Sequence, residues 1–350
     1  MKRKITWGIL GCAGIAERAL IPAIHGAGNG LLLGIAARDP GRAREWACKF
    51  DIPKSYSNYQ ALLDDPDIDA VYIPLPNHLH REWTCRAARA GKHVLCEKPM
   101  ALNSGEVREM KEAAAKAGVL LMEAFMYRFH PQMEKTLALV RSGAVGEIRS
   151  VRSTFTFSFE GNPANYRWQP EMGGGALYDV GCYPVSAARL VFGAEPASVF
   201  ARARFHPRCK VDMTTALLLE FPGGRFASLD CGFDSQFQSS LEVAGSCGRI
   251  SLARAFSAKL SDMEIRVVTG DKTRAIPVPS TNQYTRMVEH FGVCILRKRP
   301  LRYSPEDALA NMKVIDAAFR SIRTGRPVRT DDRKIGREAG LRPENPPERS

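Results

Sequence analysis

A lysine and a proline at the end of a predicted strand form the segment of this chain best suited to chemistry. Cys96-Glu97-Lys98-Pro99-Met100 follows the apolar run 91–95. The proline forces a turn, which puts Lys98 at the mouth of the crevice that such a strand end borders. The ordinary pKa of lysine is about 10.4, so near neutral pH Lys98 works through a lowered pKa or through its charge. Glu97 is on the other strand face and is predicted to orient a cofactor. The alternative is a solvated lysine at a strand end.

A carboxylate and a phenol in the second half of the chain are suited to work with this lysine. Asp179 and Tyr183 follow the glycines 173–175 and are four residues apart in a predicted helix, so they share one face. Together with Lys98 they would form a trio for general acid–base catalysis. In it the positive charge of Lys98 would favour the phenolate of Tyr183 and so help the phenol to give or take a proton. The alternative is that Asp179 holds the glycine turn and Tyr183 belongs to the core.

A glycine-rich turn near the N-terminus predicts a dinucleotide site. The segment 8–16 reads Gly-Ile-Leu-Gly-Cys-Ala-Gly-Ile-Ala and lies between a predicted strand and a predicted helix. Such a turn allows close approach of a pyrophosphate, which the free N–H groups of the helix start then bind. Ala13 occupies the second glycine position of the ideal pattern. The predicted binding residues are Gly11, Ala13, Gly14 and Ile15.

Arg38 bears on whether the predicted cofactor is NAD or NADP. Where a site for NAD usually has an acidic residue, the second predicted strand ends in Ala36-Ala37-Arg38-Asp39. An arginine fork suits a 2′-phosphate, so NADP is favoured and NAD remains the alternative. Asp39 precedes Pro40, which suits a helix cap better than a ribose contact. The other interpretation of Arg38 is an exposed surface arginine.

A stiff loop after the third strand is predicted to face the same crevice. It reads Pro74-Leu75-Pro76-Asn77-His78-Leu79-His80. We expect Pro74, Leu75, Asn77 and His80 to contact the cofactor. The histidine pair lacks a third ligand nearby, so no metal site is predicted.

Alternating strands and helices must position these residues. In the first part of the chain this alternation predicts a parallel, doubly wound sheet, whose strand ends share one crevice. The strands are expected at 5–10, 31–37, 70–74, 93–96 and 119–124, and the helices at 15–25, 78–90 and 104–117.

The rest of the chain predicts an α+β domain with a larger, mostly antiparallel sheet. Strands are expected at 148–159, 198–204, 214–221, 225–231, 239–244 and 264–268, and helices at 132–142, 175–191, 282–296 and 305–324. We therefore divide the chain into a nucleotide-binding domain, 1–125, and a domain for substrate binding and oligomerisation, 126–328. The polar, proline-bearing tail 329–350 is expected to be poorly ordered.

The composition is that of an ordinary globular protein. Of 350 residues, 45% are hydrophobic and 25% charged, and 50 basic against 37 acidic residues give a net charge of +13. The basic residues are scattered and no nucleic-acid-binding motif is present, so a nucleotide phosphate explains the charge better than nucleic acid. The nine cysteines form no CxxC pair, which predicts a reduced, cytoplasmic protein. No apolar run reaches the about 18 residues of a membrane span, and the glycine-broken start predicts no export.

Four segments together resemble one known family. They are the glycine turn, Glu97-Lys98-Pro99, Met122–Phe129 and Gly173–Tyr183. The chain resembles the glucose–fructose oxidoreductase/inositol dehydrogenase (Gfo/Idh/MocA) family over about residues 4–327. It is most similar to the branch of dimeric dihydrodiol dehydrogenases and NADP-linked D-xylose dehydrogenases, whose second-strand arginine matches Arg38. The resemblance implies a Rossmann domain and a second domain whose open sheet forms homodimers or higher homo-oligomers.

The resemblance also implies roles for single residues. Lys98 matches a lysine that orients substrate and aids proton transfer at the cofactor, and Asp179 matches its acidic partner. Tyr183 stands where many members have histidine. Arg167, Trp168 and Tyr284 fall where some reductases of the family contact NADP.

The sequence thus predicts an NADP-dependent oxidoreductase. It would transfer a hydride between nicotinamide and a carbon of a sugar, a sugar derivative or a cyclic diol. Two alternatives remain: a glycosidase or epimerase that recycles tightly bound NAD, and a non-catalytic nucleotide sensor. The exact substrate is not readable from the sequence.

Overall fold

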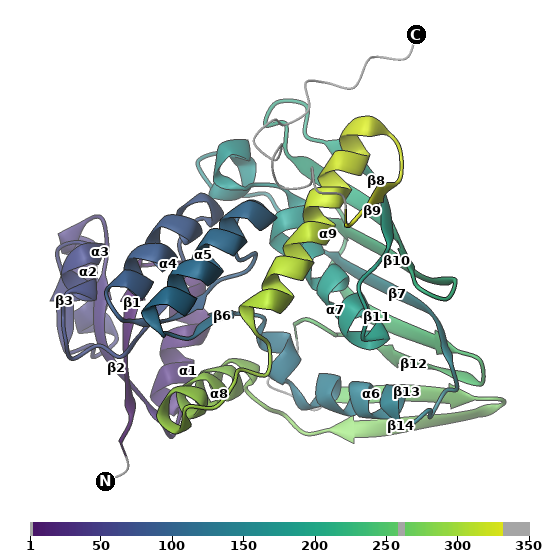
Figure 1. The fold of residues 1–350 in the computed structure, drawn as a ribbon, viewed down its shortest axis with the longest axis horizontal. Helices are drawn as coiled ribbons and strands as arrows, with labels where there is room; N and C mark the ends of the chain where they lie inside the picture. Colours follow the sequence, from purple (N-terminus) through teal and green to yellow (C-terminus); the bar gives the residue numbers. More distant parts are fainter. Residues whose placement is uncertain (1–2, 258–262, 332–350) are drawn as a thin grey trace. The chain divides into compact units, whose positions relative to one another are not determined.

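The computed structural model describes residues 3–257 and 263–331, which form two compact units (Figure 1). Unit 1 contains the chain up to Ala101, Glu106–Phe129 and Asn282–Leu309. Unit 2 contains Leu102–Gly105, His130–Thr281 and the chain from Ala310 onward.

Unit 1 is built on the predicted doubly wound sheet. All pairings in it are parallel, and the strand order is β3-β2-β1-β4-β5-β6. The chain order reverses between β1 and β4, which is where sheets of this kind bind ligands at the carboxyl ends of their strands. The strands are β1 (Ile5–Leu10), β2 (Gly30–Ala36), β3 (Lys54–Tyr56), β4 (Ala70–Ile73), β5 (His93–Cys96) and β6 (Leu121–Glu123).

Helices flank this sheet because its central strands are buried on both faces. Trp7, Ile9, Val71 and Leu95 are all fully buried, as expected for apolar runs in a parallel sheet. The helices are α1 (Ile21–Gly26), preceded by the π-helical segment η1 (Ala16–Leu20), α2 (Pro40–Lys49), α3 (Tyr59–Leu63), α4 (His80–Arg89) and α5 (Ser104–Ala117).

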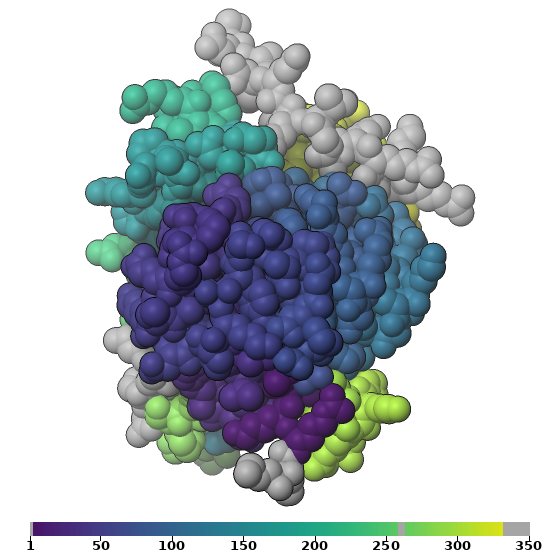
Figure 2. All heavy atoms as spheres, turned by 90° about the vertical axis from the view of Figure 1, so that its left-hand side faces the viewer, coloured from purple at the N-terminus to yellow at the C-terminus, as the bar shows by residue number. Residues whose placement is uncertain are grey.

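A late segment of the chain also belongs to unit 1. Helix α8 (Gln283–Arg297) packs against α1, β1 and β2, and Phe291 lies 5.6 Å from Trp7 between ring centroids. Figure 2 shows the yellow-green atoms of this segment beside the purple atoms of the first residues. A single boundary at residue 125 does not describe this arrangement, because the apolar face of α8 is buried against unit 1.

Unit 2 contains the predicted mostly antiparallel sheet. In residues 3–257 and 263–331 its nine strands follow the order β14-β13-β12-β11-β7-β10-β9-β8-β15, and only β7 and β10 among these strands pair in parallel. The strands are β7 (Ile148–Thr156), β8 (Ser198–Phe205), β9 (Asp212–Phe221), β10 (Arg225–Gly232), β11 (Gln238–Gly245), β12 (Gly248–Leu252), β13 (Met263–Thr269), β14 (Lys272–Val278) and β15 (Val328–Arg329). The other long helices are α6 (Pro131–Arg141), α7 (Cys182–Phe192) and α9 (Pro305–Thr324).

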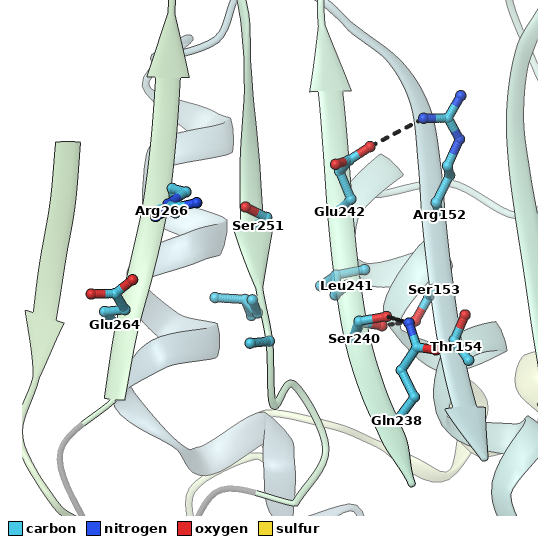
Figure 3. A pocket seen from close by; sticks show the side chains of 12 residues that line it. Arg152, Ser153, Thr154, Gln238, Ser240, Leu241, Glu242, Ser251, Glu264 and Arg266 are labelled. Atoms are coloured by element: carbon cyan, nitrogen blue, oxygen red, sulfur yellow. Dashed lines mark hydrogen bonds and ion pairs between the residues drawn. The ribbon is translucent and has the colours of Figure 1, made fainter. Parts of the chain in front are cut away.

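In the part of the chain that the structure describes, helices cover one face of this sheet and leave the other open. Helix α7 contacts β7, β10 and β11, and α6 contacts β13 (Figure 1). In β9, Leu217 and Leu219 are buried whereas Leu218 is 46% exposed, so side chains alternate between the two faces. Figure 3 shows part of the open face, a groove of about 570 Å³ across β7, β11, β12 and β13 that includes the ion pair of Arg152 with Glu242.

The structure corrects two details of the sequence prediction. The tail does not begin at Arg329, because β15 pairs with β8 through Val328 and Arg329. Residues 332–350, which form most of the tail 329–350 that was expected to be poorly ordered, lie outside the described residues. The helix expected from 175 to 191 is a π-helical segment, η6 (Leu177–Gly181), followed by α7.

Candidate active site

The glycine turn of unit 1 has the backbone that a dinucleotide requires. Gly11 has a φ of +113°, and a Cβ there would lie 2.9 Å from a methyl carbon of Leu75. Its N–H donates to the carbonyl of Ala36 (2.8 Å), which joins the ends of β1 and β2. Gly14 lies beneath the Arg18 guanidinium, and Ile15 precedes η1. A residue with a side chain at position 11 would therefore be strained and crowded.

A cavity of about 220 Å³ brings several predicted residues together at the carboxyl ends of the strands. It lies entirely within unit 1. Its lining includes Gly11, Ala13, Arg38, Pro74 and Leu75, with Cys12, Ala37, Asp39, Arg42, Tyr59, Pro76 and Leu79. This set fits the adenosine side of a dinucleotide, since it combines the glycine turn with exposed cations at the end of β2.

Arg42 also lines this cavity, and it was not among the residues predicted from the sequence. It is exposed, lies in the first turn of α2 and donates from Nη2 to the carbonyl of Cys12 (3.2 Å). A cation in the first turn of a helix is unfavourable with respect to the helix dipole, so helix stability does not explain its place there. Asp39 is the N-cap of α2 and accepts from the N–H of Gly41 (2.8 Å), as its position before proline predicted.

Glu97 and Lys98 belong to a charged cluster in unit 1. The buried Glu97 accepts from the hydroxyl of Tyr72 (2.6 Å) and from the backbone N–H of Lys98 (3.2 Å). Lys98 itself is half-buried. Burial and Glu97 raise the pKa of Tyr284, against the opposing charges of Lys98 and Arg18. The structure thus brings Tyr284, from the first turn of α8, into the field of the predicted catalytic lysine.

Asn77 and His80 are less accessible than the sequence analysis expected. Asn77 is 3% exposed and begins the short helix η2 (Asn77–Leu79). His80 is fully buried, and its two ring nitrogens lie 2.9 Å from the carbonyl of Pro99 and 2.7 Å from that of Leu75. Both ring nitrogens of His80 therefore face backbone carbonyls of the protein itself, and contact of His80 with the cofactor remains a prediction.

Asp179 and Tyr183 lie at the junction of η6 and α7 in unit 2. Asp179 is 4% exposed and Tyr183 is 5% exposed. The Tyr183 ring packs edge-on against Phe155 (5.2 Å between centroids) and near Phe256 (5.5 Å). The charges of both Asp179 and Tyr183 raise the pKa of Arg167, so both side chains lie near its guanidinium.

Arg167 and Trp168 also belong to unit 2. Arg167 forms two hydrogen bonds to the carboxylate of Asp179. Trp168 stacks on Phe159 (5.1 Å between centroids) and donates from its indole N–H to the carbonyl of Gly161 (3.1 Å). The predicted site residues are thus distributed over both units, and the joint action of Lys98 with Asp179 and Tyr183 remains a prediction.

The described residues contain neither a metal cluster nor a membrane-spanning helix. Among residues 3–257 and 263–331, no cluster of three or more His, Cys, Asp or Glu side chains is arranged to hold a metal ion. No helix in the same residues is long and apolar enough to span a membrane.

Comparison with known proteins identifies the family. Residues 5–125 match the model of an oxidoreductase family with an NAD-binding Rossmann fold, and residues 133–251 match the GFO/IDH/MocA C-terminal domain. The chain belongs to the GFO/IDH/MocA family. It is therefore an NAD(P)-dependent oxidoreductase, and the resemblance stated from the sequence is confirmed.

Relatives of this GFO/IDH/MocA protein include enzymes with known substrates. It is 38% identical to D-xylose 1-dehydrogenase (NADP⁺) 2 of Haloferax volcanii, over 93% of this chain and 99% of that one. It is 34% identical to trans-1,2-dihydrobenzene-1,2-diol dehydrogenase of Xenopus laevis, over 81% and 86%. Its structure matches a 3-ketoreductase from Actinomadura kijaniata, solved with NADP and TDP-benzene, with a TM-score of 0.85, 34% identity and coverage of 90% and 97%.

Proposed function

We propose that this protein is an NADP-dependent oxidoreductase that acts on a sugar, a sugar derivative or a cyclic diol. The observation that carries the proposal is similarity over almost the whole chain to enzymes named for such substrates. NADP as the cofactor is supported by the two exposed arginines, Arg38 and Arg42, that line the cavity at the end of β2.

In the proposed reaction, bound nicotinamide supplies the hydride acceptor or donor. When an alcohol is oxidised, the carbon–hydrogen bond gives its electron pair as hydride and the hydroxyl releases its proton. Tyr183 takes that proton, and in the reverse direction returns it. Lys98 assists through its positive charge, and Asp179 accepts hydrogen bonds from the substrate and the lysine. Glu97 and Tyr284 lie near Lys98 and orient the cofactor beside it.

Replacing Lys98 tests this assignment. We expect Lys98→Met to lower kcat by at least about 100-fold, because general acid–base groups contribute this much or more. NADPH should still bind, measured by its fluorescence on titration. Lys135→Met is a matched control on α6, where the lysine donates to the carbonyl of Pro277 (3.1 Å). Near-normal turnover of Lys98→Met would remove the lysine from the mechanism.

The cofactor preference is tested with Arg38 and Arg42. Hydrogen bonds to charged groups contribute about 1.5–3 kcal/mol, so Arg38→Ala should raise the KM for NADP roughly 10- to 150-fold and leave that for NAD nearly unchanged. Arg42→Ala should act in the same direction. Steady-state kinetics with both cofactors measure the effect, and equal changes for NADP and NAD would refute a 2′-phosphate site.

The two alternative functions give different results in one screen. Aldoses, polyols, ketosugars and dihydrodiols are offered with each cofactor in both directions, while NADPH absorbance is followed. A glycosidase or epimerase would retain its cofactor through purification and convert substrate without a net absorbance change. A nucleotide sensor would bind the cofactor and convert none of these substrates.

We further propose a cytoplasmic homodimer that forms through the open face of the unit 2 sheet. Leu218 and Phe226 are 46% and 43% exposed on adjacent strands of this face. The groove beside them carries charges of both signs, Arg152 and Arg266 with Glu242 and Glu264 (Figure 3). An apolar patch beside mixed charges is suited to contact with its own copy. The cytoplasmic location rests on the cysteine pattern of the sequence.

A further inference from the structure

We propose that Arg167 is a positioning residue that holds Asp179 as a carboxylate in one orientation beside Tyr183. The inference rests on the proposed role of Asp179 in the reaction, and it adds a residue that acts through Asp179. It also differs from the role that the family resemblance implied for Arg167, which was contact with NADP.

The geometry of the pair is specific. Arg167 Nε donates to Asp179 Oδ2 (2.6 Å), and Nη2 donates to Oδ1 (3.1 Å). Two parallel bonds fix the plane of the carboxylate as well as its place, which a single bond from lysine does not. The Asp179 side chain is only 5% exposed and that of Arg167 is 27% exposed, so water has little access to the carboxylate. A carboxylate this deeply buried needs such a partner to remain charged.

Aromatic rings hold the guanidinium in place. Its central carbon lies 4.9 Å from the ring centroid of Tyr166 and 5.4 Å from that of Phe159. The backbone N–H of Arg167 donates to the side chain of Asn165 (3.0 Å), the N-cap of η4 (Tyr166–Trp168). Arginine can stack on rings and form a fork at the same time, so this surrounding selects arginine over lysine.

The Arg167–Asp179 pair decides which of two groups, Asp179 or Tyr183, exchanges the proton with the substrate. Burial by itself would lower the pKa of Arg167, but the Asp179 carboxylate and Tyr166 hold it above its usual value. The guanidinium therefore remains charged and keeps Asp179 ionised as a hydrogen-bond acceptor. Proton exchange with substrate then falls to Tyr183, which lies within the electric field of the same guanidinium.

Other ionisable groups surround η6, and a pH profile must be interpreted with them in view. They are Tyr166 on η4, Cys182 and Tyr183 on α7, Asp212 on β9 and Cys231 on β10. Burial raises the pKa of Cys231 well above its usual value, so this thiol does not titrate between pH 5 and 9.

The test uses Arg167→Ala in the full-length protein. We expect kcat to fall roughly 10- to 100-fold while the KM for NADP stays within about 3-fold, because Arg167 acts through Asp179. Added guanidinium chloride at non-denaturing concentration should restore part of the lost kcat. The acidic limb of the kcat profile should move to higher pH, because a carboxylate without its cation takes up a proton more readily.

Two further variants separate the effect of the Arg167 fork from that of its charge and from the loss of any buried arginine. Arg167→Lys preserves the charge without the fork, so kcat should still fall and guanidinium should not restore it. Arg189→Ala removes another fork of unit 2, Nε and Nη2 to the exposed carboxylate of Glu195 (2.6 and 2.8 Å), and should show no gain from guanidinium.

Several outcomes would overturn the proposal. They are a raised KM for NADP with normal kcat, which would make Arg167 a cofactor ligand, or normal kcat in Arg167→Lys. Loss of kcat in Arg167→Ala without rescue or a pH shift would also overturn it. A wild-type protein without turnover on any substrate would instead refute the proposed function, which separates the two failures.

Discussion

His80 shows how a polar residue in a predicted binding loop can serve the loop itself. Its ring nitrogens face the carbonyls of Pro99 and Leu75, which lie in the loops after β5 and β4. Burial lowers the pKa of His80 to about 4, although both carbonyls act in the opposite direction. The ring is therefore neutral at pH 7, so it donates its single N–H to one of the two carbonyls and packs against the other.

This state of His80 predicts how stability depends on pH. In the unfolded chain its pKa is about 6.5, so between pH 6.5 and 4 the unfolded state binds a proton that the folded state does not. Stability from this group is complete above pH 6.5 and falls on acidification, by about 3 kcal/mol at pH 4. Urea unfolding from pH 7 to 4.5 should show a shallower pH dependence in His80→Asn than in the wild type. The control His25→Asn changes an exposed histidine, and equal pH dependence in the two variants would contradict the prediction.

At the scale of elements, η6 depends on a residue far away in the sequence. Asp212, on β9, accepts from the backbone N–H of Leu177 (2.7 Å) and from the hydroxyl of Thr215 (3.0 Å). Gly175 lies directly against it, with a φ of +107°, and a Cβ there would be 2.0 Å from the Asp212 carboxylate. The glycine thus allows the acidic side chain to cap the segment that carries Asp179.

Two glycine variants separate backbone strain from this contact. Gly224 has a φ of +69° and no atom within 4 Å of a built Cβ, so Gly224→Ala should cost only the about 1–2 kcal/mol of left-handed backbone. Gly175→Ala adds a clash with Asp212 and should cost roughly 3 kcal/mol or more. Urea unfolding measures both, and kcat should fall in Gly175→Ala alone. Equal losses of stability would mean that the contact with Asp212 is unimportant.

The elements also show what a single sequence can reveal. Strands β1, β4 and β5 were predictable because burial on both faces makes them continuous apolar runs. Strand β3 was not, because Lys54–Tyr56 is a short, polar edge strand. The π-helical form of η6 was not predictable either, since its cap comes from β9. Arg38 was readable from its place after a strand, whereas the partner of Asp179 became visible only when the fold brought Arg167 to it.

At the scale of the whole molecule, the open sheet face carries the proposed assembly. Leu218 is on β9 and pairs in register with Phe200 of β8 and Ser228 of β10, so it lies well inside the sheet. A large apolar side chain in the middle of an exposed sheet face is suited to burial by a partner. A two-fold interface would bury Leu218 of each copy, so one substitution in the sequence removes two buried leucines from the interface.

Leu218→Glu should therefore dissociate the proposed dimer. Burial of one leucine contributes about 1.5–3 kcal/mol, and counting it in both copies gives a rise in the dimer Kd of at least roughly 100-fold. Sedimentation velocity over a range of protein concentrations measures the change. Leu31→Glu is the matched control, because Leu31 is equally exposed, at 48%, but lies on β2 of unit 1. A monomeric wild type, or equal dissociation in both variants, would show that the open face does not hold a second copy.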